Sequence, residues 1–421
     1  MKILVIAGFV IPKAASLIGE QEVPFGGWVS SLLEGLSKIE GVELALVMKS
    51  NQKELITKKD GAINYYYLPT NAKNNLDVYI EDCSKVLALF KPDILHAEGA
   101  ESFITNRFFS IFKGKKLISI KGVFYNVQEH EYGGLKLNDL ILTFSLSKII
   151  FGLTQFYTKN IRFRKRKFLE RNSYELSQYV IGRTIYDNAH ALSFNKNLKY
   201  FHNNENLRTV FYNKQWGLKK VEQFSLIIGN GYIARKGAHM VFHAVSILKE
   251  EFPTIKLYIV GTKAKSLKDK LTYKGYLNTL LTKYKIEKQV FFLGILNAEE
   301  MAESMKKKHV YILPSFVENS SNTLGEAMLM GMPSVVSYCG GVSSLAQDET
   351  DALFYRASDV AMLTHQIRRI FNNEIDVLAL SNKAREKAIN LYNRDKNTKR
   401  LIEIYNAIQI DNLELRASEN Y

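Results

Sequence analysis

The sequence predicts an α/β fold made of two doubly wound domains. Short apolar runs alternate with helix-like segments along the chain, as in parallel sheets whose strands are buried on both faces. This alternation starts again near residue 222, after a polar stretch at 200–220. The length of 421 residues also suits two domains of ordinary size. We therefore expect a first domain at 1–210 and a second at 222–385, with a linker around 205–222.

The expected strands are the continuous apolar runs. In the first domain they lie at 2–9, 42–47, 64–68, 94–97, 116–120 and 178–181. In the second domain they lie at 224–229, 256–260, 290–293, 310–313 and 334–337. Helical periodicity predicts helices that include 28–39, 78–90, 239–251 and 273–284, and one long helix over 381–408.

Composition narrows the class of protein. Cys83 and Cys339 are the only cysteines, which excludes a disulfide framework and a cysteine-based zinc site, and which fits a reducing cytosol. The best apolar segment, 140–157, is interrupted by Lys148, so no transmembrane helix is expected. Residues 1–7 are interpreted as a buried first strand and not as a signal peptide. The net charge of +15 indicates an anionic partner.

The most informative motif follows the strand at 310–313. A Ser/Asn-rich loop after Pro314 leads into a helix predicted at about 322–330, which Gly331 terminates. A helix N-terminus binds diphosphate through its backbone N–H groups. Glu318 lies before this helix, where it can hold sugar hydroxyls, and Glu326 lies in its first turns, where it can accept hydrogen bonds from a ribose. The alternative is two surface glutamates around an ordinary helix cap.

A second motif follows the strand at 224–229. Gly231 belongs to a glycine-rich loop that ends in Arg235 and Lys236. Lys236 is a candidate to neutralise a leaving diphosphate, and Arg235 a candidate to bind it bidentately. The alternative is a solvated Arg-Lys turn.

The third motif is the glycine pair Gly26 and Gly27, which precedes the first long helix. Paired glycines let the backbone approach a phosphate closely. The alternative is a tight turn. The chain does not open with Gly-x-Gly-x-x-Gly, which argues against a nicotinamide dehydrogenase.

Three polar side chains stand at the carboxyl ends of predicted strands, where α/β sheets bind ligands. His96, Lys121 and Arg183 are therefore candidates for a cleft that receives an acceptor. No Asp-x-Asp motif and no cluster at metal-ligand spacing occurs, so no metal site is expected.

The string from Pro314-Ser315 through Leu324-Gly325-Glu326-Ala327 to Val336 resembles the signature of family 4 glycosyltransferases, as do Gly340-Gly341, Arg235-Lys236-Gly237 and Gly26-Gly27. The resemblance implies a GT-B fold: two Rossmann-like domains facing a central cleft, with residues 386–421 forming a C-terminal helix that packs back on the first domain, plus a tail. It also implies transfer with retention of anomeric configuration and without a metal.

The resemblance further implies roles for individual residues. Glu318 would hold the donor sugar and Glu326 the ribose. Lys236 and the backbone N–H groups of Asn322, Thr323 and Leu324 would meet the diphosphate, with Gly26 or Gly27 under the phosphates from the other domain. Two positions depart from the family: Lys121 stands where many members have His, and the usual Arg before Lys236 is absent, with Tyr232 and Ala234 in its place.

These observations predict transfer of a sugar from a UDP-sugar or GDP-sugar to a hydroxyl of a glycan or lipid-linked saccharide, with no other cofactor. Segments 182–187 and 203–212 resemble members that act in bacterial surface polysaccharide synthesis: capsular, exopolysaccharide or lipopolysaccharide. One alternative is a GT-B sugar-nucleotide epimerase or phosphorylase. A further alternative is a non-catalytic partner that binds a sugar nucleotide within an assembly complex.

Residues 136–171 carry nine basic side chains against two acidic ones. Within this stretch, 149–171 places apolar and aromatic residues beside clustered cations, which suits an anionic membrane surface. The alternative is a solvated basic helix face. Nucleic-acid binding is not expected, because no recognition module accompanies the charge. We therefore expect a cytoplasmic protein that is peripheral at the inner face of the cell membrane.

Overall fold

The computed structural model describes residues 1–20, 26–71, 74–136, 146–264, 266 and 272–411, with backbone alone at 74–76 and 146–159. The chain forms two compact units. Unit 1 comprises Met1–Lys121, Lys165–Asn206 and Tyr392–Tyr421, and unit 2 comprises Gly122–Arg164 and Leu207–Leu391. Residues 122–164 lie in the span expected for the first domain, yet they group with unit 2.

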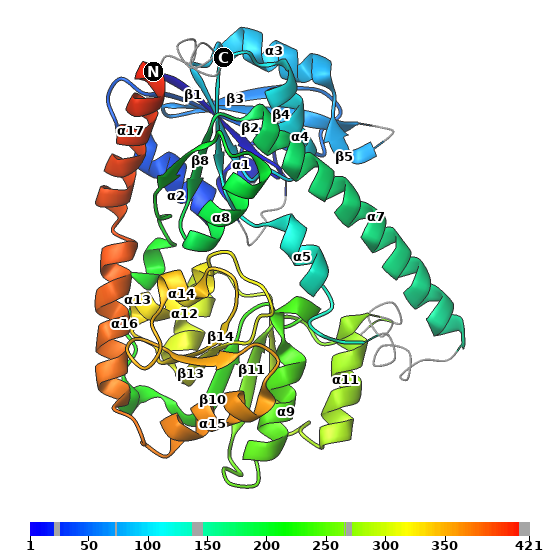
Figure 1. Cartoon of the computed structure of the whole chain (residues 1–421), viewed down its shortest axis with the longest axis vertical. Helices are drawn as coiled ribbons and strands as arrows, with labels where there is room; N and C mark the ends of the chain where they lie inside the picture. The colour runs from blue at the N-terminus through cyan, green and yellow to red at the C-terminus, as the bar shows by residue number, and fades with distance from the viewer. Residues whose placement is uncertain (21–25, 72–73, 137–145, 265, 267–271, 412–421) are drawn as a thin grey trace. The chain divides into compact units, whose positions relative to one another are not determined.

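Unit 1 is built on a mainly parallel sheet with the order β3-β4-β2-β1-β6-β7-β8-β9, in which β5 pairs with β4 (Figure 1). Only the β3–β4 and β4–β5 pairings are antiparallel in the described sheet. Its strands are β1 Lys2–Ala7, β2 Glu43–Ser50, β3 Ile56–Asp60, β4 Ile63–Asn71, β5 Asn74–Val78, β6 Ile94–Glu98, β7 Lys115–Ser119, β8 Tyr179–Gly182 and β9 Lys199–His202. Its helices are α1 Pro12–Ser16, α2 Gly27–Leu36, α3 Ile80–Phe90, α4 Phe103–Ile111, α8 Ile185–Phe194 and α17 Arg394–Ile410.

Unit 2 is built on a parallel sheet with the order β12-β11-β10-β13-β14-β15. Its strands are β10 Glu222–Ile228, β11 Lys256–Val260, β12 Val290–Gly294, β13 Lys308–Leu313, β14 Ser334–Tyr338 and β15 Leu353–Arg356. Its helices are α5 Phe124–His130, α9 Ala238–Leu248, α11 Tyr273–Tyr284, α12 Ala298–Lys306, α13 Asn322–Met330, α14 Val342–Leu345, α15 Val360–Phe371 and α16 Val377–Leu391. Short 3-10 turns lie at η1 Thr209–Phe211, η2 Leu218–Lys220 and η3 Ala234–Lys236.

The predicted fold class is confirmed, because each sheet is parallel at its centre and has the doubly wound order. In each sheet the strand order reverses once beside the first strand: between β1 and β6 in unit 1, and between β10 and β13 in unit 2. Such a switch point leaves a crevice at the carboxyl ends of the strands, where α/β sheets bind ligands. The strands that the sequence pattern does not predict are short or polar. For example, β3 is the solvated run Ile-Thr-Lys-Lys-Asp.

Helix α7, Leu146–Leu176, belongs to both units: its residues up to Arg164 group with unit 2 and those from Lys165 with unit 1. No helix in the described part of the chain is long and apolar enough to cross a membrane.

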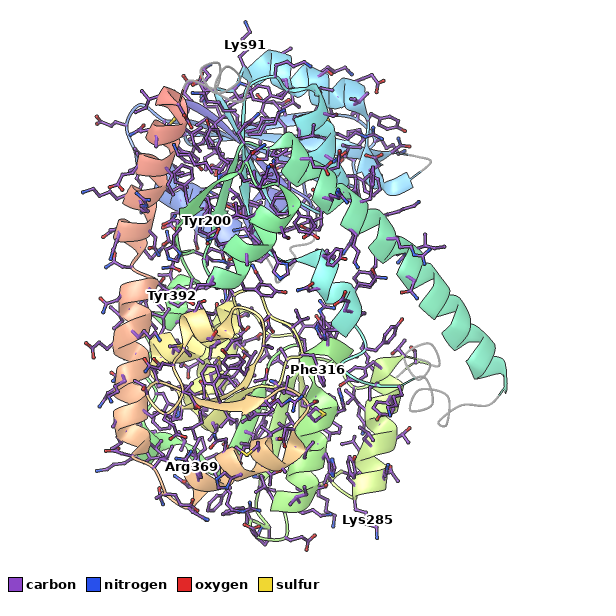
Figure 2. The ribbon with its side chains drawn as sticks, in the orientation of Figure 1. Lys91, Tyr200, Lys285, Phe316, Arg369 and Tyr392 are labelled. Carbon is purple, nitrogen blue, oxygen red and sulfur yellow. The ribbon has the colours of Figure 1, made fainter. Side chains whose placement is uncertain are left out.

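The predicted single helix over 381–408 is wrong, because the chain breaks there into two helices. α16 ends at Leu391, and Asn393 caps α17 by accepting a hydrogen bond from the Lys396 backbone N–H at 2.9 Å. Asparagine is among the residues that best satisfy the unpaired N–H groups at a helix start. Buried Tyr392 marks the break in Figure 2. α17 belongs to unit 1, where its apolar face joins the hydrophobic core through Leu401, Ile404, Tyr405 and Ile408.

Replacing Ile404 by Ala tests whether α17 is part of the unit 1 core. Ile404 is 1% exposed, so the truncation should lower the free energy of unfolding by about 2–4 kcal/mol in urea titrations. Ile410, on the same helix, is 78% exposed and is the matched control; its change to Ala should stay within about 0.5 kcal/mol. Equal effects of the two changes would mean that α17 does not pack as described.

Candidate active site

The site candidates of unit 2 meet at the switch point of its sheet. β10 leads to the η3 turn that carries Arg235 and Lys236, and the neighbouring strand β13 leads to the loop that carries Glu318. There the Lys236 ammonium donates to Glu318 Oε1 in an ion pair. The Ser315 hydroxyl donates to the same oxygen at 2.6 Å. Two of the residues predicted to contact a donor are thus in direct contact.

Close backbone contacts hold the three loops around this ion pair. Gly237 has φ +72°, and a Cβ there would stand 1.9 Å from the Pro314 carbonyl oxygen. Gly340 has φ +51°, and a Cβ there would stand 1.8 Å from the carbonyl oxygen of Glu318. That same oxygen accepts from the Gly341 N–H at 3.0 Å. Only glycine allows both the left-handed backbone and such a short distance to a carbonyl oxygen. The packed loops therefore fix the positions of Lys236 and Glu318.

The N-terminus of α13 faces the same crevice. The boundaries predicted for this helix are confirmed: Ser321 caps it by accepting from the Leu324 N–H at 3.3 Å, and Gly331 ends it with φ 73°. Leu324 N–H is therefore engaged within the cap. Asn322 and Thr323 occupy the first turn, and a Cβ on Gly229 would lie 3.6 Å from the Thr323 methyl. The glycine loop after β10 thus borders the first turn of α13.

Gly231 lies within that loop. It is buried, its N–H donates to the Val260 carbonyl at 3.2 Å, and a Cβ there would strike Ile259 at 2.2 Å. Tyr311 on β13 is buried, and its hydroxyl interacts with the side chains of Ser321 and Thr323. Burial raises the Tyr311 pKa, and the nearby carboxylates Glu318 and Glu326 raise it further.

Glu326 is held by a partner that the sequence did not predict. Arg208 grips it with two parallel hydrogen bonds, Nε to Oε1 at 2.6 Å and Nη2 to Oε2 at 2.7 Å. The Arg208 guanidinium also lies 4.8 Å from the centre of the Phe211 ring. Glu326 is only 3% exposed, so burial raises its pKa while Arg208 opposes the rise. A bidentate fork of this kind fixes the orientation of a carboxylate.

Arg235 points to a different partner from Lys236. Its Nη1 donates to Glu131 Oε2 at 2.6 Å, and Glu131 is 5% exposed. Gly133 in the same segment packs on this turn, since a Cβ there would stand 2.2 Å from the Ala234 carbonyl oxygen, and His239 Nε2 on α9 lies 3.0 Å from the Gly133 carbonyl oxygen. Phe316, labelled in Figure 2, stacks on His239 with ring centres 5.7 Å apart. The Glu131–Arg235 pair therefore fastens residues 131–133 to the turn that carries Lys236.

In unit 1, the three acceptor candidates lie together at the ends of β6, β7 and β8. They line one hollow that is open to solvent, and they surround two carboxylates that the sequence had not assigned. Lys121 Nζ lies 2.7 Å from Glu98 Oε2 and also pairs with Glu205, and Arg183 Nη1 lies 2.8 Å from the other oxygen of Glu205. The formal charges of these two acids and two bases cancel.

His96 is a buried, neutral member of this cluster. Its ring nitrogens lie 2.6 Å from the Tyr405 hydroxyl and 2.6 Å from the Ser119 hydroxyl, so one nitrogen can donate and the other accept. Burial, aided by the Lys121 charge, lowers the His96 pKa to about 3. The Glu98 carboxylate 3.4 Å away is therefore not an ion-pair partner of His96 at neutral pH.

The glycine pair begins α2 as predicted. Gly26 is the N-cap residue with φ 91°, and the helix starts at Gly27. Phe25 lies outside the described residues. Among the side chains that the structure describes, no three His, Cys, Asp or Glu groups gather as metal ligands would.

The comparison with known families falls on unit 2. Residues 209–390 match the family model described as glycosyl transferases group 1, a range that nearly coincides with Leu207–Leu391 of that unit. An uncharacterised glycosyltransferase of Methanocaldococcus jannaschii is 22% identical over 223 residues, or 53% of each chain. The Escherichia coli UDP-Gal:alpha-D-GlcNAc-diphosphoundecaprenol alpha-1,3-galactosyltransferase is 24% identical over 124 residues, 30% of this chain and 31% of that protein. The chain thus aligns with about half or less of these relatives' length.

Solved structures resemble the whole chain. Sucrose-phosphate synthase from Thermosynechococcus elongatus has a TM-score of 0.75 at 16% identity and covers 97% of this chain and 99% of its own. HepE from Anabaena, solved in complex with UDP-glucose, has a TM-score of 0.67 at 15% identity and covers 97% and 100%. The fold is therefore that of the GT-B glycosyltransferases.

Replacing Arg208 by Met tests the fork on Glu326. The variant leaves a buried carboxylate without its cation, which should cost about 2–4 kcal/mol of unfolding free energy near pH 8. Without Arg208 the pKa of Glu326 rises further above that of the unfolded chain. The native state then binds the extra proton, so the deficit should shrink as the pH falls to 5. Urea titrations of Arg208→Met and of the unchanged protein at pH 8 and pH 5 measure this loss of unfolding free energy.

The double variant Arg208→Met/Glu326→Gln is the control, because a neutral amide needs no cation. It should recover part of the loss at pH 8 and show no extra pH dependence. A deficit in Arg208→Met that is the same at pH 5 and pH 8 would contradict the assignment.

The protonation of His96 is a separate prediction. Its ring should stay neutral from pH 8 to about pH 4 in NMR titrations of the native protein, whereas the unfolded chain takes up this proton near pH 6.5. Since the unfolded state then binds more protons below about pH 6.5, His96 lowers stability as the pH falls. A native His96 titration between pH 6 and 7 would refute the buried, neutral assignment.

Proposed function

We propose that this protein transfers a sugar from a nucleotide-sugar donor to an acceptor hydroxyl, with retention of anomeric configuration and without a metal ion, as family 4 glycosyltransferases do. The observation that carries the proposal is the arrangement at the switch point of unit 2. A cation, a carboxylate and a helix N-terminus converge there within a segment that matches the group 1 glycosyl transferases.

The donor's diphosphate belongs at the N-terminus of α13, beside Lys236. The helix dipole and the N–H groups of the first turn favour negative charge there. An ammonium group carries three N–H donors, so Lys236 can contact a phosphate while it keeps Glu318. Glu318 then faces the sugar hydroxyls. Because Arg235 donates to Glu131, we assign Arg235 to holding the turn and Lys236 to meeting the charge.

Glu326 can receive the ribose although Arg208 already occupies it. A carboxylate offers about four lone-pair positions, and the fork uses two of them. The remaining two suit a pair of neighbouring ribose hydroxyls. UDP is the nucleotide that we favour over GDP, since HepE was solved with UDP-glucose and the E. coli relative is named for UDP-Gal.

The acceptor is a hydroxyl of a glycan or lipid-linked saccharide, and we assign it to the hollow of unit 1. Lys121 and Arg183 are both paired with carboxylates there, so the hollow offers a polar lining without excess charge. Such a lining suits a neutral, hydroxyl-rich sugar better than a polyanion. The name of the E. coli relative contains a lipid diphosphate acceptor, which supports a role in surface polysaccharide synthesis.

In the proposed reaction, the bond between the anomeric carbon and the diphosphate oxygen breaks, and a bond to the acceptor oxygen forms on the same face. The acceptor proton passes to the leaving phosphate. Lys236 and the first turn of α13 stabilise the charge that develops on that phosphate, which is the largest catalytic effect expected of such a site.

The alternatives with the same fold are a sugar-nucleotide epimerase and a phosphorylase. Incubation with donor alone identifies an epimerase, because an epimerase converts the donor without an acceptor. A phosphorylase would instead consume a glycan and inorganic phosphate and would release no nucleoside diphosphate. A non-catalytic sugar-nucleotide-binding partner would bind the nucleotide yet release no nucleoside diphosphate with any acceptor pool.

Lys236→Ala and Glu318→Ala should each lower the release of nucleoside diphosphate about 100-fold or more, measured with UDP-sugars and GDP-sugars and a lipid-linked saccharide pool. Calorimetry should find weaker UDP binding in Lys236→Ala and near-normal UDP binding in Glu318→Ala, because of these two side chains only Lys236 is assigned to the diphosphate. Exposed Lys288→Ala is the matched control and should behave as the unchanged protein. Full turnover in both site variants would exclude the proposal.

A further inference from the structure

Phe168 on α7 is 69% exposed, although the chain has an apolar core to bury it in. Lys165 and Arg171, both exposed, lie one turn before and one turn after it on the same face of the helix. On the same face, Arg164 is exposed one turn before Phe168, and Ile161, two turns before it, is 38% exposed. These five residues form the outer stripe of α7.

The opposite face of this helix packs inward. Leu169 is 6% exposed, and Ser173 and Tyr174 are at most 1% exposed. The acidic neighbour Glu170 is fully buried with them. The other acid, Glu175, forms an exposed pair with Arg171 at 2.8 Å, of a kind that is worth little in water. The outer stripe is therefore positive, with an apolar side chain at its centre.

We infer that the outer stripe of α7 docks on an anionic lipid bilayer. A soluble polyanion would use the cations and leave Phe168 in water. A bilayer uses both, since phosphate headgroups meet the cations and an aromatic ring enters the boundary between headgroups and acyl chains. The two apolar side chains, seven residues apart on one face, reach the same depth when the helix lies parallel to the surface. The apolar residues expected to join them at 149–157 have side chains outside the described set.

Membrane docking by this surface does not depend on sugar transfer, so this inference can be tested separately from the proposed function. Docking would bring a lipid-linked acceptor within reach, but the test needs no turnover. It uses the full chain and flotation with vesicles of phosphatidylcholine alone or of phosphatidylcholine mixed with phosphatidylglycerol.

The protein should float with the phosphatidylglycerol vesicles and stay behind with neutral ones, and added salt should reduce its recovery. Lys165→Glu/Arg171→Glu should lower partitioning about tenfold or more, and Phe168→Ser should lower it several-fold. Leu89→Ser is the matched control, because Leu89 on α3 is 64% exposed and lies outside the stripe; it should change nothing.

Equal recovery with neutral and anionic vesicles overturns the inference, as does unchanged flotation of the Lys165→Glu/Arg171→Glu variant. Normal flotation of Phe168→Ser, together with tight binding of inorganic polyphosphate, would identify a polyanion site in place of a membrane surface and would also overturn it. Circular dichroism and urea titration of each variant confirm that it is folded.

Discussion

The site of unit 2 depends on the backbone contact between Gly340 and the Glu318 carbonyl. A side chain at either Gly340 or Gly237 would collide with a carbonyl oxygen less than 2 Å away, so the loops after β10, β13 and β14 can approach only through glycine. Their approach brings Lys236, which follows β10, to Glu318, which follows β13. Electrostatic stabilisation requires charges that are fixed before the reaction, and this contact fixes them.

Both units contain charged side chains at their switch points, but they balance charge differently. In unit 2, Lys236 is matched by Glu318, and the N-terminus of α13 adds positive potential to the same crevice. In unit 1, Lys121 and Arg183 are each matched by a carboxylate around neutral His96. The first arrangement suits a diphosphate and the second a neutral saccharide, which agrees with the donor and acceptor sites that we propose.

The parts of the structure that the sequence predicts correctly are those marked by local signals, such as capping residues and apolar runs. Ser321 and Gly331 define α13 by capping chemistry alone, and apolar runs define the central strands. The switch-point rule then brings Lys236 and Glu318 together. The fork from Arg208 to Glu326 and the pair of Glu131 with Arg235 join residues 118 and 104 positions apart, and no local pattern reports such pairings. The break between α16 and α17 is marked in the sequence by the capping residue Asn393, a local signal that the apolar periodicity over 381–408 does not contain.

A structure of the protein bound to UDP is the most direct test of the donor site. We expect the diphosphate at the first turn of α13 with Lys236 Nζ in hydrogen-bonding contact, and the ribose hydroxyls on Glu326 while Arg208 keeps its fork. A nucleotide bound in the hollow of unit 1 beside His96 and Lys121, with Lys236 and Glu318 still paired only to each other, would contradict the account.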